Sequence, residues 1–372
     1  MTINALIKKG KSATFPLMLL SIVLFSGSLS AQNAREVLRK PIGKGAYELV
    51  YSQGEDALYL ATSQSRKLDK GGVVYRLNPA TLDVTQIIHN DIKPLGAAIN
   101  NKTNMLFFSN TVNSAITAID AKTGKVMKRL VLDSRKGSET VKPLAPRELV
   151  VDADTDTLYI TGVGGSSVVW VVNGEDLTLR TTITHTGKLG TGLALDSAAN
   201  RLFVTNADGE LVTIDTKSNK VLSRKKLDAS KEHFFLNISL DIATHRAFIT
   251  DSKQPQVLVV DTRNGNILGK IDVPESLAVL FNPVRNEVYV THRQAGEVSV
   301  IDAQSHHLLN TIKTPTHPNS LALSADGQTL YISIKQAASR EKEASAPDDV
   351  MRRLSRLLIL RPSRASFSSR FW

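Results

Sequence analysis

The chain has 372 residues, of which 42% are hydrophobic and 22% charged, a composition typical of a soluble globular protein. It contains no cysteine, which excludes disulfides, thiol catalysis, zinc–thiolate sites and a cysteine-linked lipid anchor. Its formal net charge of +11 falls to +2 for residues 32–350 when the nine cations at the two ends are set aside. The overall charge is therefore weak evidence for a polyanionic partner.

The first 31 residues have the three-part order of a secretory signal peptide. Lysines at positions 8, 9 and 11 precede an apolar run at residues 15–25, and the small residues SGSLSA follow. The run is too short to span the ~30 Å hydrocarbon core of a membrane, so we expect cleavage between Ser28 and Ala31 rather than retention as an anchor. The sequence predicts an exported protein with no stable membrane span after cleavage.

A short motif, an aromatic or apolar triplet that ends near Thr, Ser or Asn, recurs seven times at intervals of 41–52 residues. That period matches one four-stranded blade of a β-propeller. A β-helix has shorter repeats, and a β-sandwich does not keep a sevenfold register. The copies are LYLAT from Leu58, LFFSN from Leu106, LYITG from Leu158, LFVTN from Leu202, AFITD from Ala247, VYVTH from Val288 and LYISI from Leu330.

Two further strand patterns flank each copy. An apolar segment with small residues precedes it, as in TGLALD before Leu202, and suits a strand at a crowded central channel. An alternating segment follows it, as in LVTID up to Asp215, and a tight turn leads to an outer strand. Residues 36–40 resemble an outer strand with no upstream partner, and the last repeat lacks one. We predict an all-β fold, a single seven-bladed β-propeller with four-stranded blades over residues 32–350, closed by an N-terminal strand that completes the last blade.

The triplet, as FVTN at residues 203–206 and YVTH at 289–292, resembles the YVTN-repeat β-propeller family. Loop segments such as GKGAYE (43–48) and NTVNSAITAIDAKTGKV (110–126) resemble an enterobacterial periplasmic branch of that family, and the similarity covers roughly residues 34–350. The resemblance implies a periplasmic, non-enzymatic propeller associated with binding single-stranded DNA. We expect no cofactor.

The resemblance ends inside the final strand. The family continues with a strand of the type DDVIRIAL, whereas Asp348, Asp349 and Val350 are followed here by MRRLSRLLILRPSRASFSSRFW. This segment, residues 351–372, is rich in arginine and serine, has no acidic residue and is expected to be an irregular tail. A shifted reading frame is favoured over a basic tail for a polyanion, because the match breaks abruptly.

Two sets of loops meet at one face of a propeller, those that precede each channel strand and those that follow each second strand. Here both sets carry cations and aromatic residues, the groups that contact phosphates and stack on bases in single-stranded nucleic acids. A solvated face with core aromatic residues is the alternative interpretation. The candidate nucleic-acid-binding residues are Lys44, Tyr47, Arg66, Lys67, Lys70, Lys93, Arg147, Lys188, His233, Phe234, Lys253, His292, Arg293 and His317.

Other functions have weaker support in the sequence. The eight histidines include no pair spaced for metal binding beside a carboxylate, so no metal is expected. The sequence has no nucleophile elbow, P-loop or HExxH motif, and no catalytic residue is predicted. Glu48 and Glu148 occupy equivalent places in two channel strands, and a lactonase-like enzyme would need them. A protein-interaction scaffold for an envelope partner would use the same loop face.

Overall fold

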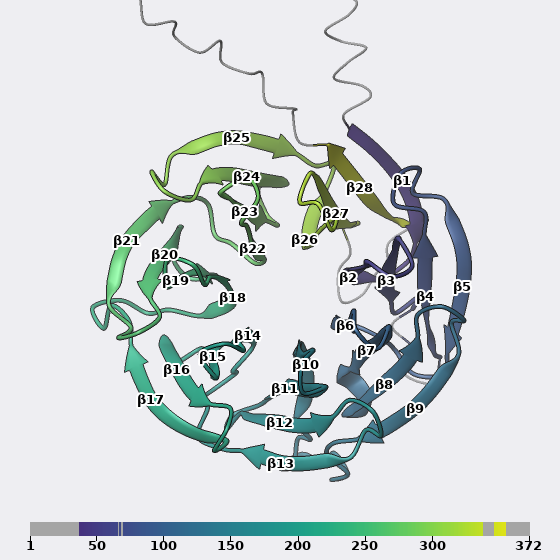
Figure 1. Cartoon of the computed structure of the whole chain (residues 1–372), viewed down its shortest axis with the longest axis horizontal. Coiled ribbons are helices and arrows are strands. Elements are labelled where there is room, and N and C mark those ends of the chain that lie inside the picture. Colours follow the sequence, from purple (N-terminus) through teal and green to yellow (C-terminus); the bar gives the residue numbers. More distant parts are fainter. Residues whose placement is uncertain (1–36, 66, 68–69, 338–345, 355–372) are drawn as a thin grey trace, which may run out of the picture.

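The fold is a closed ring of seven β-sheets around a central channel (Figure 1). The computed structural model describes residues 37–65, 67, 70–337 and 346–354. Each sheet has four antiparallel strands, and the predicted seven-bladed β-propeller is therefore confirmed. The predicted signal peptide and residues 355–372 lie outside the described residues.

Blades 1 to 6 each run outward from the channel through four consecutive strands. Blade 1 contains β2 (Ala46–Ser52), β3 (Ala57–Thr62), β4 (Gly72–Leu77) and β5 (Val84–Asn90), and blade 2 contains β6 (Ala97–Asn100), β7 (Met105–Asn110), β8 (Ala115–Asp120) and β9 (Val126–Val131). Blade 3 contains β10 (Ala145–Asp152), β11 (Thr157–Val163), β12 (Val168–Asn173) and β13 (Leu179–Ile183), and blade 4 contains β14 (Gly192–Asp196), β15 (Arg201–Thr205), β16 (Glu210–Asp215) and β17 (Lys220–Lys226). Blade 5 contains β18 (Phe235–Asp241), β19 (Arg246–Asp251), β20 (Gln256–Asp261) and β21 (Ile267–Asp272), and blade 6 contains β22 (Val279–Asn282), β23 (Glu287–His292), β24 (Glu297–Asp302) and β25 (Leu308–Lys313). The described part of the chain also has a short 3-10 helix, η1 (Thr111–Asn113), and none of its helices could cross a membrane.

Blade 7 joins the two ends of the described chain, and Figure 1 shows these ends side by side. Its strands run outward as β26 (His317–Leu323), β27 (Thr329–Lys335), β28 (Asp348–Leu354) and β1 (Val37–Gly43). The predicted closure by an N-terminal strand is confirmed, because β1 pairs antiparallel with β28.

The domain boundary predicted after residue 350 is wrong. Residues 351–354, assigned to an irregular tail, form the second half of β28, with Arg353 opposite Val37 on one side and Leu330 on the other. Pairing on both sides uses main-chain groups, which do not depend on how well the side chains match the family. The sheet therefore continues past the point where the sequence resemblance stops.

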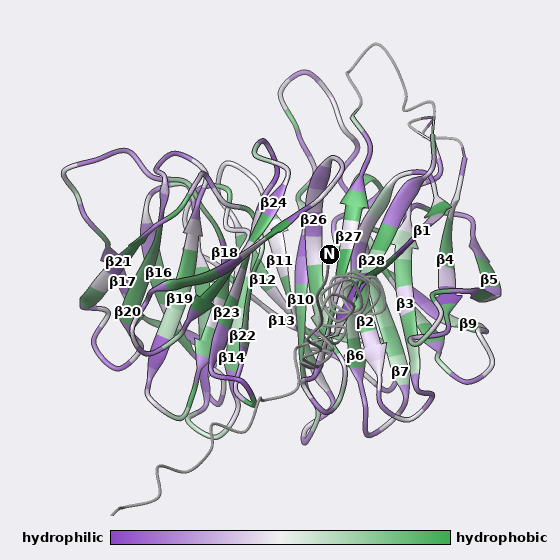
Figure 2. Ribbon diagram, turned by 90° about the horizontal axis from the view of Figure 1, so that it is seen from above, coloured by the Kyte–Doolittle hydropathy of each residue, from purple (hydrophilic) through white to green (hydrophobic). Residues whose placement is uncertain are grey.

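Position within a blade decides how far a strand is buried. Neighbouring blades pack on both faces of the second strands, and in β3 every residue of ALYLAT is buried. The outermost strands face solvent, and β17 carries exposed Arg224 and Lys226. Apolar cores lie between adjacent sheets, as where Trp170 of blade 3 packs with Phe107 of blade 2. Figure 2 shows this division as green strands between purple turns.

In blades 2, 3, 5 and 7, the fourth residue of the repeated motif donates its hydroxyl group to a backbone carbonyl of the next blade. In blade 5, Thr250 Oγ1 accepts a hydrogen bond from the amide of Asn237 in its own channel strand (3.0 Å). It also donates to the carbonyl of Leu277, beside the channel strand of blade 6 (2.8 Å). Ser333 of blade 7 donates in the same way to the carbonyl of Tyr47 in blade 1 (2.7 Å). Thr or Ser recurs at this position, which we call the bridging hydroxyl, because buried backbone groups need partners.

Blade 1 departs from this pattern, because Ala61 occupies the position of the bridging hydroxyl. The amide of Glu48 instead donates directly to the carbonyl of Leu95 in blade 2 (3.2 Å). The Glu48 carboxylate accepts a hydrogen bond from the amide of Ala97 (3.0 Å). An acidic side chain therefore takes part in the contact between blades 1 and 2.

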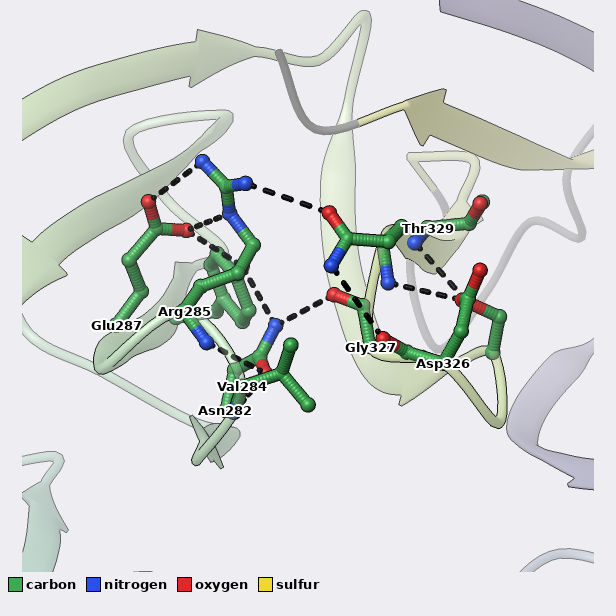
Figure 3. Close-up of polar contacts among 10 residues, drawn as sticks. Asn282, Val284, Arg285, Glu287, Asp326, Gly327 and Thr329 are labelled. Carbon is green, nitrogen blue, oxygen red and sulfur yellow. Dashed lines mark hydrogen bonds and ion pairs between the residues drawn. The ribbon is translucent and has the colours of Figure 1, made fainter. Parts of the chain in front are cut away.

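The bridging hydroxyls lie near the start of each channel strand. At the other end of the strand, its last residue caps the turn that follows, as Asn282 does in blade 6 (Figure 3). Its Oδ1 accepts the amides of Val284 (3.1 Å) and Arg285 (3.3 Å), and its Nδ2 donates to the carbonyl of Gly327 in blade 7 (2.8 Å). Gly327 has φ +66°, and a Cβ there would lie 2.9 Å from the Val284 side chain, so glycine is required. These contacts fix blade 7 against blade 6.

Replacing a bridging hydroxyl should destabilise the ring. We expect Thr250→Val to lower the free energy of unfolding by about 1–3 kcal/mol, because it leaves the Asn237 amide without its partner and removes one of the two hydrogen bonds to the Leu277 carbonyl. Thr250→Ser keeps the hydroxyl and is the matched control, with a loss expected to be less than half as large. Urea unfolding of the two variants measures the difference. Equal stabilities of wild type and Thr250→Val would show that the hydroxyl contributes nothing to the contact between blades.

Candidate functional site at the channel mouth

Two connected cavities lie on the channel axis, at the end where the channel strands begin. The outer one, which we call the mouth cavity, has a volume of about 520 Å³. The inner one, the channel cavity, has a volume of about 220 Å³. Arg147, Leu277 and Asn319 line both, so the two cavities adjoin each other. The mouth cavity is lined by residues of blades 1, 3, 6 and 7 and has the size of a small-ligand site.

Irregular strand pairing directs side chains into these cavities. The register of β2 against β3 shifts between Ala46 and Leu49, and the register of β10 against β11 shifts between Pro146 and Leu149. Such a bulge leaves residues unpaired and changes the direction of their side chains. The residues inside the two shifts are Tyr47, Glu48, Arg147 and Glu148, all of which line one or both cavities.

More cations than carboxylates line the mouth cavity, which has Lys44, Arg147, Arg293 and Lys335 against Asp348 among its described residues. The guanidinium groups of Arg147 and Arg293 form no hydrogen bond or ion pair with the part of the chain that the structure describes, and Arg293 Nε is buried. Burial lowers the pKa of Arg293, and repulsion from Arg147 adds to the lowering. An anion between them would relieve the repulsion and supply an acceptor for the buried donor.

Tyr47 is held beside these cations. The ammonium group of Lys335 lies 3.4 Å from the centroid of the Tyr47 ring, a cation–π contact. The carbonyl of Tyr47 accepts hydrogen bonds from Ser333 Oγ (2.7 Å) and Asn319 Nδ2 (3.5 Å). All three contacts come from blade 7, so Tyr47 of blade 1 is held against its neighbouring blade, next to positive charge.

Two further titratable groups at the mouth bond to the backbone. Asp348 accepts the amides of Ala46 (2.7 Å) and Gln336 (2.6 Å), which link β28 to blade 1 and to the loop after β27. His317 Nδ1 lies 2.7 Å from the carbonyl of Arg293, so this nitrogen carries the proton that it donates. The Asp348 carboxylate is thus engaged within the ring rather than paired with the mouth cations.

Glu48 and Glu148 form a carboxyl pair in the channel cavity. They occupy equivalent positions in blades 1 and 3, and Gly96, the equivalent residue of blade 2, has no side chain to separate them. Burial raises the pKa of Glu48 well above its usual range, and the charge of Glu148 raises it further. Burial also raises the pKa of Glu148, while Arg147 opposes that rise. The two carboxyls are coupled, and both have pKa values raised by burial.

The fourteen candidate residues do not all come together. Four of the fourteen are exposed on loops outside the mouth cavity, namely Lys67, Lys70, Lys188 and Lys253. Lys253 forms an ion pair with Glu232 at 3.6 Å. Phe234 is half-buried, and Arg66 lies outside the described residues. The five that line the mouth cavity are Lys44, Tyr47, Arg147, Arg293 and His317.

Three candidates have structural roles, and their interpretation as ligand contacts is corrected. Lys93 is 4% exposed, and its ammonium group donates to two loop carbonyls of blade 1. His233 is buried with Nδ1 2.6 Å from the Asp251 carboxylate, and His292 is buried with Nε2 2.8 Å from Ser299 Oγ. Membership of a loop does not tell whether a side chain points toward solvent or into the core.

The mouth cavity is also lined by Lys335, Gln64 and Gln336, which were not among the predicted site residues. Lys335 follows LYISI as Arg293 follows VYVTH, so the position of the loop could have found it. The two glutamines have no charge and no distinctive spacing. Within the described ranges, no three His, Asp or Glu side chains are placed to hold a metal ion.

The architecture defines the class of protein as a seven-bladed β-propeller, here with a cation-lined cavity at its mouth. Comparisons with known proteins identify its family. Residues 113–337 match the family model described as outer membrane protein assembly factor BamB. The chain is 67% identical over 336 residues to the uncharacterized protein YncE of Salmonella typhimurium, and 68% identical to YncE of Escherichia coli K12. In both cases the match covers 90% of this chain and 95% of the relative.

The chain belongs to the YncE family of β-propeller proteins. Among solved structures, the Kuenenia stuttgartiensis hydrazine synthase matches with a TM-score of 0.65 at 13% identity, over 79% of this chain and 93% of that one. At that identity the likeness concerns the fold alone.

Proposed function

We propose that this chain is a periplasmic, non-enzymatic propeller that binds single-stranded DNA or a similar polyanion at its mouth cavity. The observation that carries the proposal is the convergence of Arg147 and Arg293 on that cavity without a described hydrogen-bonding or ion-pairing partner. The signal-peptide pattern of the first 31 residues supports export. The family resemblance supports the choice of DNA as the polyanion.

The chemistry of the mouth suits a single strand better than a duplex. Four cations and the Tyr47 ring lie around a cavity of about 520 Å³, a space that fits about one or two nucleotides and excludes a double helix. Cations beside an aromatic ring bind a flexible strand through its phosphates and through stacking, with little dependence on base sequence. We therefore expect a non-specific, salt-sensitive interaction.

Salt dependence tests this proposal. If two or three phosphates are contacted, affinity for a labelled oligo-dT strand should fall about 7- to 20-fold between 50 and 200 mM salt. Fluorescence anisotropy measures this for the exported chain and for a chain that ends at Leu354, which lacks four of the six C-terminal arginines. Both should bind alike. Binding that is insensitive to salt, or that requires residues 355–372, would contradict the proposal.

A further inference from the structure

We propose that the carboxyl pair of Glu48 and Glu148 makes anion binding at the mouth cavity proton-coupled, so that the protein takes up a proton when a phosphate-bearing ligand binds. The inference rests on the proposed function for its ligand. It assigns a regulatory role to residues that the proposed function does not use.

Arg147 connects the two groups of residues. It lines the mouth cavity, where the ligand is proposed to bind, and it also lines the channel cavity with Glu48 and Glu148. Arg147 and Glu148 are neighbours within the bulge of β10, and Arg147 acts electrostatically on both carboxyls. The ionisation state of the two carboxyls therefore determines how far they neutralise Arg147, and hence how strongly Arg147 attracts an anion in the mouth cavity.

Few other titratable groups face the pair. The channel cavity, which is lined by residues of β2, β6, β10, β18 and β26 among others, contains no charged side chain besides Glu48, Arg147 and Glu148 among its described residues. β6, which lies between the two carboxyls, contributes the uncharged Ala97. The groups above, at the mouth, are Lys44, Tyr47, Arg293, His317, Lys335 and Asp348.

The sign of the effect follows from linkage. A bound anion disfavours ionised carboxyls nearby, so it raises the pKa of the pair, and binding is accompanied by proton uptake. Affinity is then greatest at low pH and is lost as pH rises through the pKa of the pair. Because burial raises both carboxyl pKa values, this loss lies above the ordinary glutamate value of ~4.3.

The dissociation constant of labelled oligo-dT, measured from pH 5 to pH 9 at constant ionic strength, tests the coupling. Phosphodiesters do not titrate in this range. Wild-type affinity should fall with pH, by up to about tenfold per pH unit for one linked proton. The variant E48Q/E148Q should change by less than about twofold over the steepest pH unit of the wild type. Glutamine keeps an oxygen to accept the Ala97 amide, so the contact between blades is retained. Calorimetry in buffers of different ionisation enthalpy should show proton uptake by the wild type and almost none by the variant.

Three results would overturn the proposal. The first is an unchanged pH slope in E48Q/E148Q. The second is loss of the slope in H317N, which would assign the effect to the imidazole at the mouth. The third concerns the case in which oligo-dT binds to neither protein, so that the proposed function itself has failed.

In that case sulfate, which does not titrate above ~pH 3, replaces oligo-dT as the probe. The titration of the glutamate carboxyls is followed by NMR with and without sulfate, and the absence of a sulfate-dependent shift would reject proton coupling. Such a shift, abolished in E48Q/E148Q, would support it.

Discussion

A chain that ends at Val350 is expected to lose its closed ring, whereas a chain that ends at Leu354 is expected to keep it. Residues 351–353 pair with β1 on one side and β27 on the other, so their removal leaves residues 37–39 of β1 and the first half of β27 unpaired at this junction. Met351 is 5% exposed and packs in the core between blades 6 and 7. Its loss alone should cost about 2–5 kcal/mol.

Together with the lost ladder hydrogen bonds, this truncation should lower the free energy of unfolding by at least about 5 kcal/mol, a large part of the stability of a typical domain. Thermal unfolding followed by circular dichroism compares the two chains, and limited proteolysis reports opening of blade 7. The chain that ends at Leu354 is the control for removal of the tail as such. Indistinguishable melting temperatures would mean that the second half of β28 does not contribute to closure.

The double variant R147E/R293E is expected to weaken binding of oligo-dT at least about 100-fold at low salt. Hydrogen bonds to charged groups contribute about 1.5–3 kcal/mol each, so two lost contacts correspond to about 100-fold or more. The reversed charges also repel phosphates at the centre of the mouth cavity. Fluorescence anisotropy at 50 mM salt measures the loss.

The matched control is K188E/K253E, which changes the net charge by the same amount on exposed loops outside the mouth cavity. We expect it to weaken binding less than about threefold, because exposed charges at a distance are screened by salt. A similar loss in the two double variants would mean that overall charge, rather than the mouth, attracts the ligand.

The repeat allowed the fold to be predicted in some detail. A motif that recurs at blade spacing indicates seven sheets, because each repeat forms one blade that packs on the next, in several cases with a hydrogen bond from a residue such as Thr250. The sequence shows that Ala61 lacks the hydroxyl found in the other repeats, but it does not show that the Glu48 carboxylate bonds blade 2 instead. The extent of β28 could not be predicted either, because main-chain pairing leaves no mark in residue type.

The candidate site was predicted less completely. Equivalent positions in the repeats identified the loops that surround the channel, and Arg147, Arg293 and Tyr47 from that set line one cavity. The repeats do not tell which loop side chains turn inward, and Lys93 lies buried although its loop is at the correct face. The bulges that direct Glu48 and Arg147 into the channel depend on pairing with a second strand, which a single segment of sequence does not encode.

The junction of blades 7 and 1 lies beside the mouth cavity, and this has a consequence for turnover of the protein. Tyr47 and Lys335 belong to the two blades that separate when the ring opens, while Arg147 and Arg293 belong to blades farther round. A ligand held by all four binds the closed ring but not the opened chain, so mass action disfavours opening. At a concentration 100 times its dissociation constant, such a ligand reduces the opened population about 100-fold. Proteases that cleave opened molecules would then remove empty protein first, and the amount of protein that persists would follow the supply of its ligand.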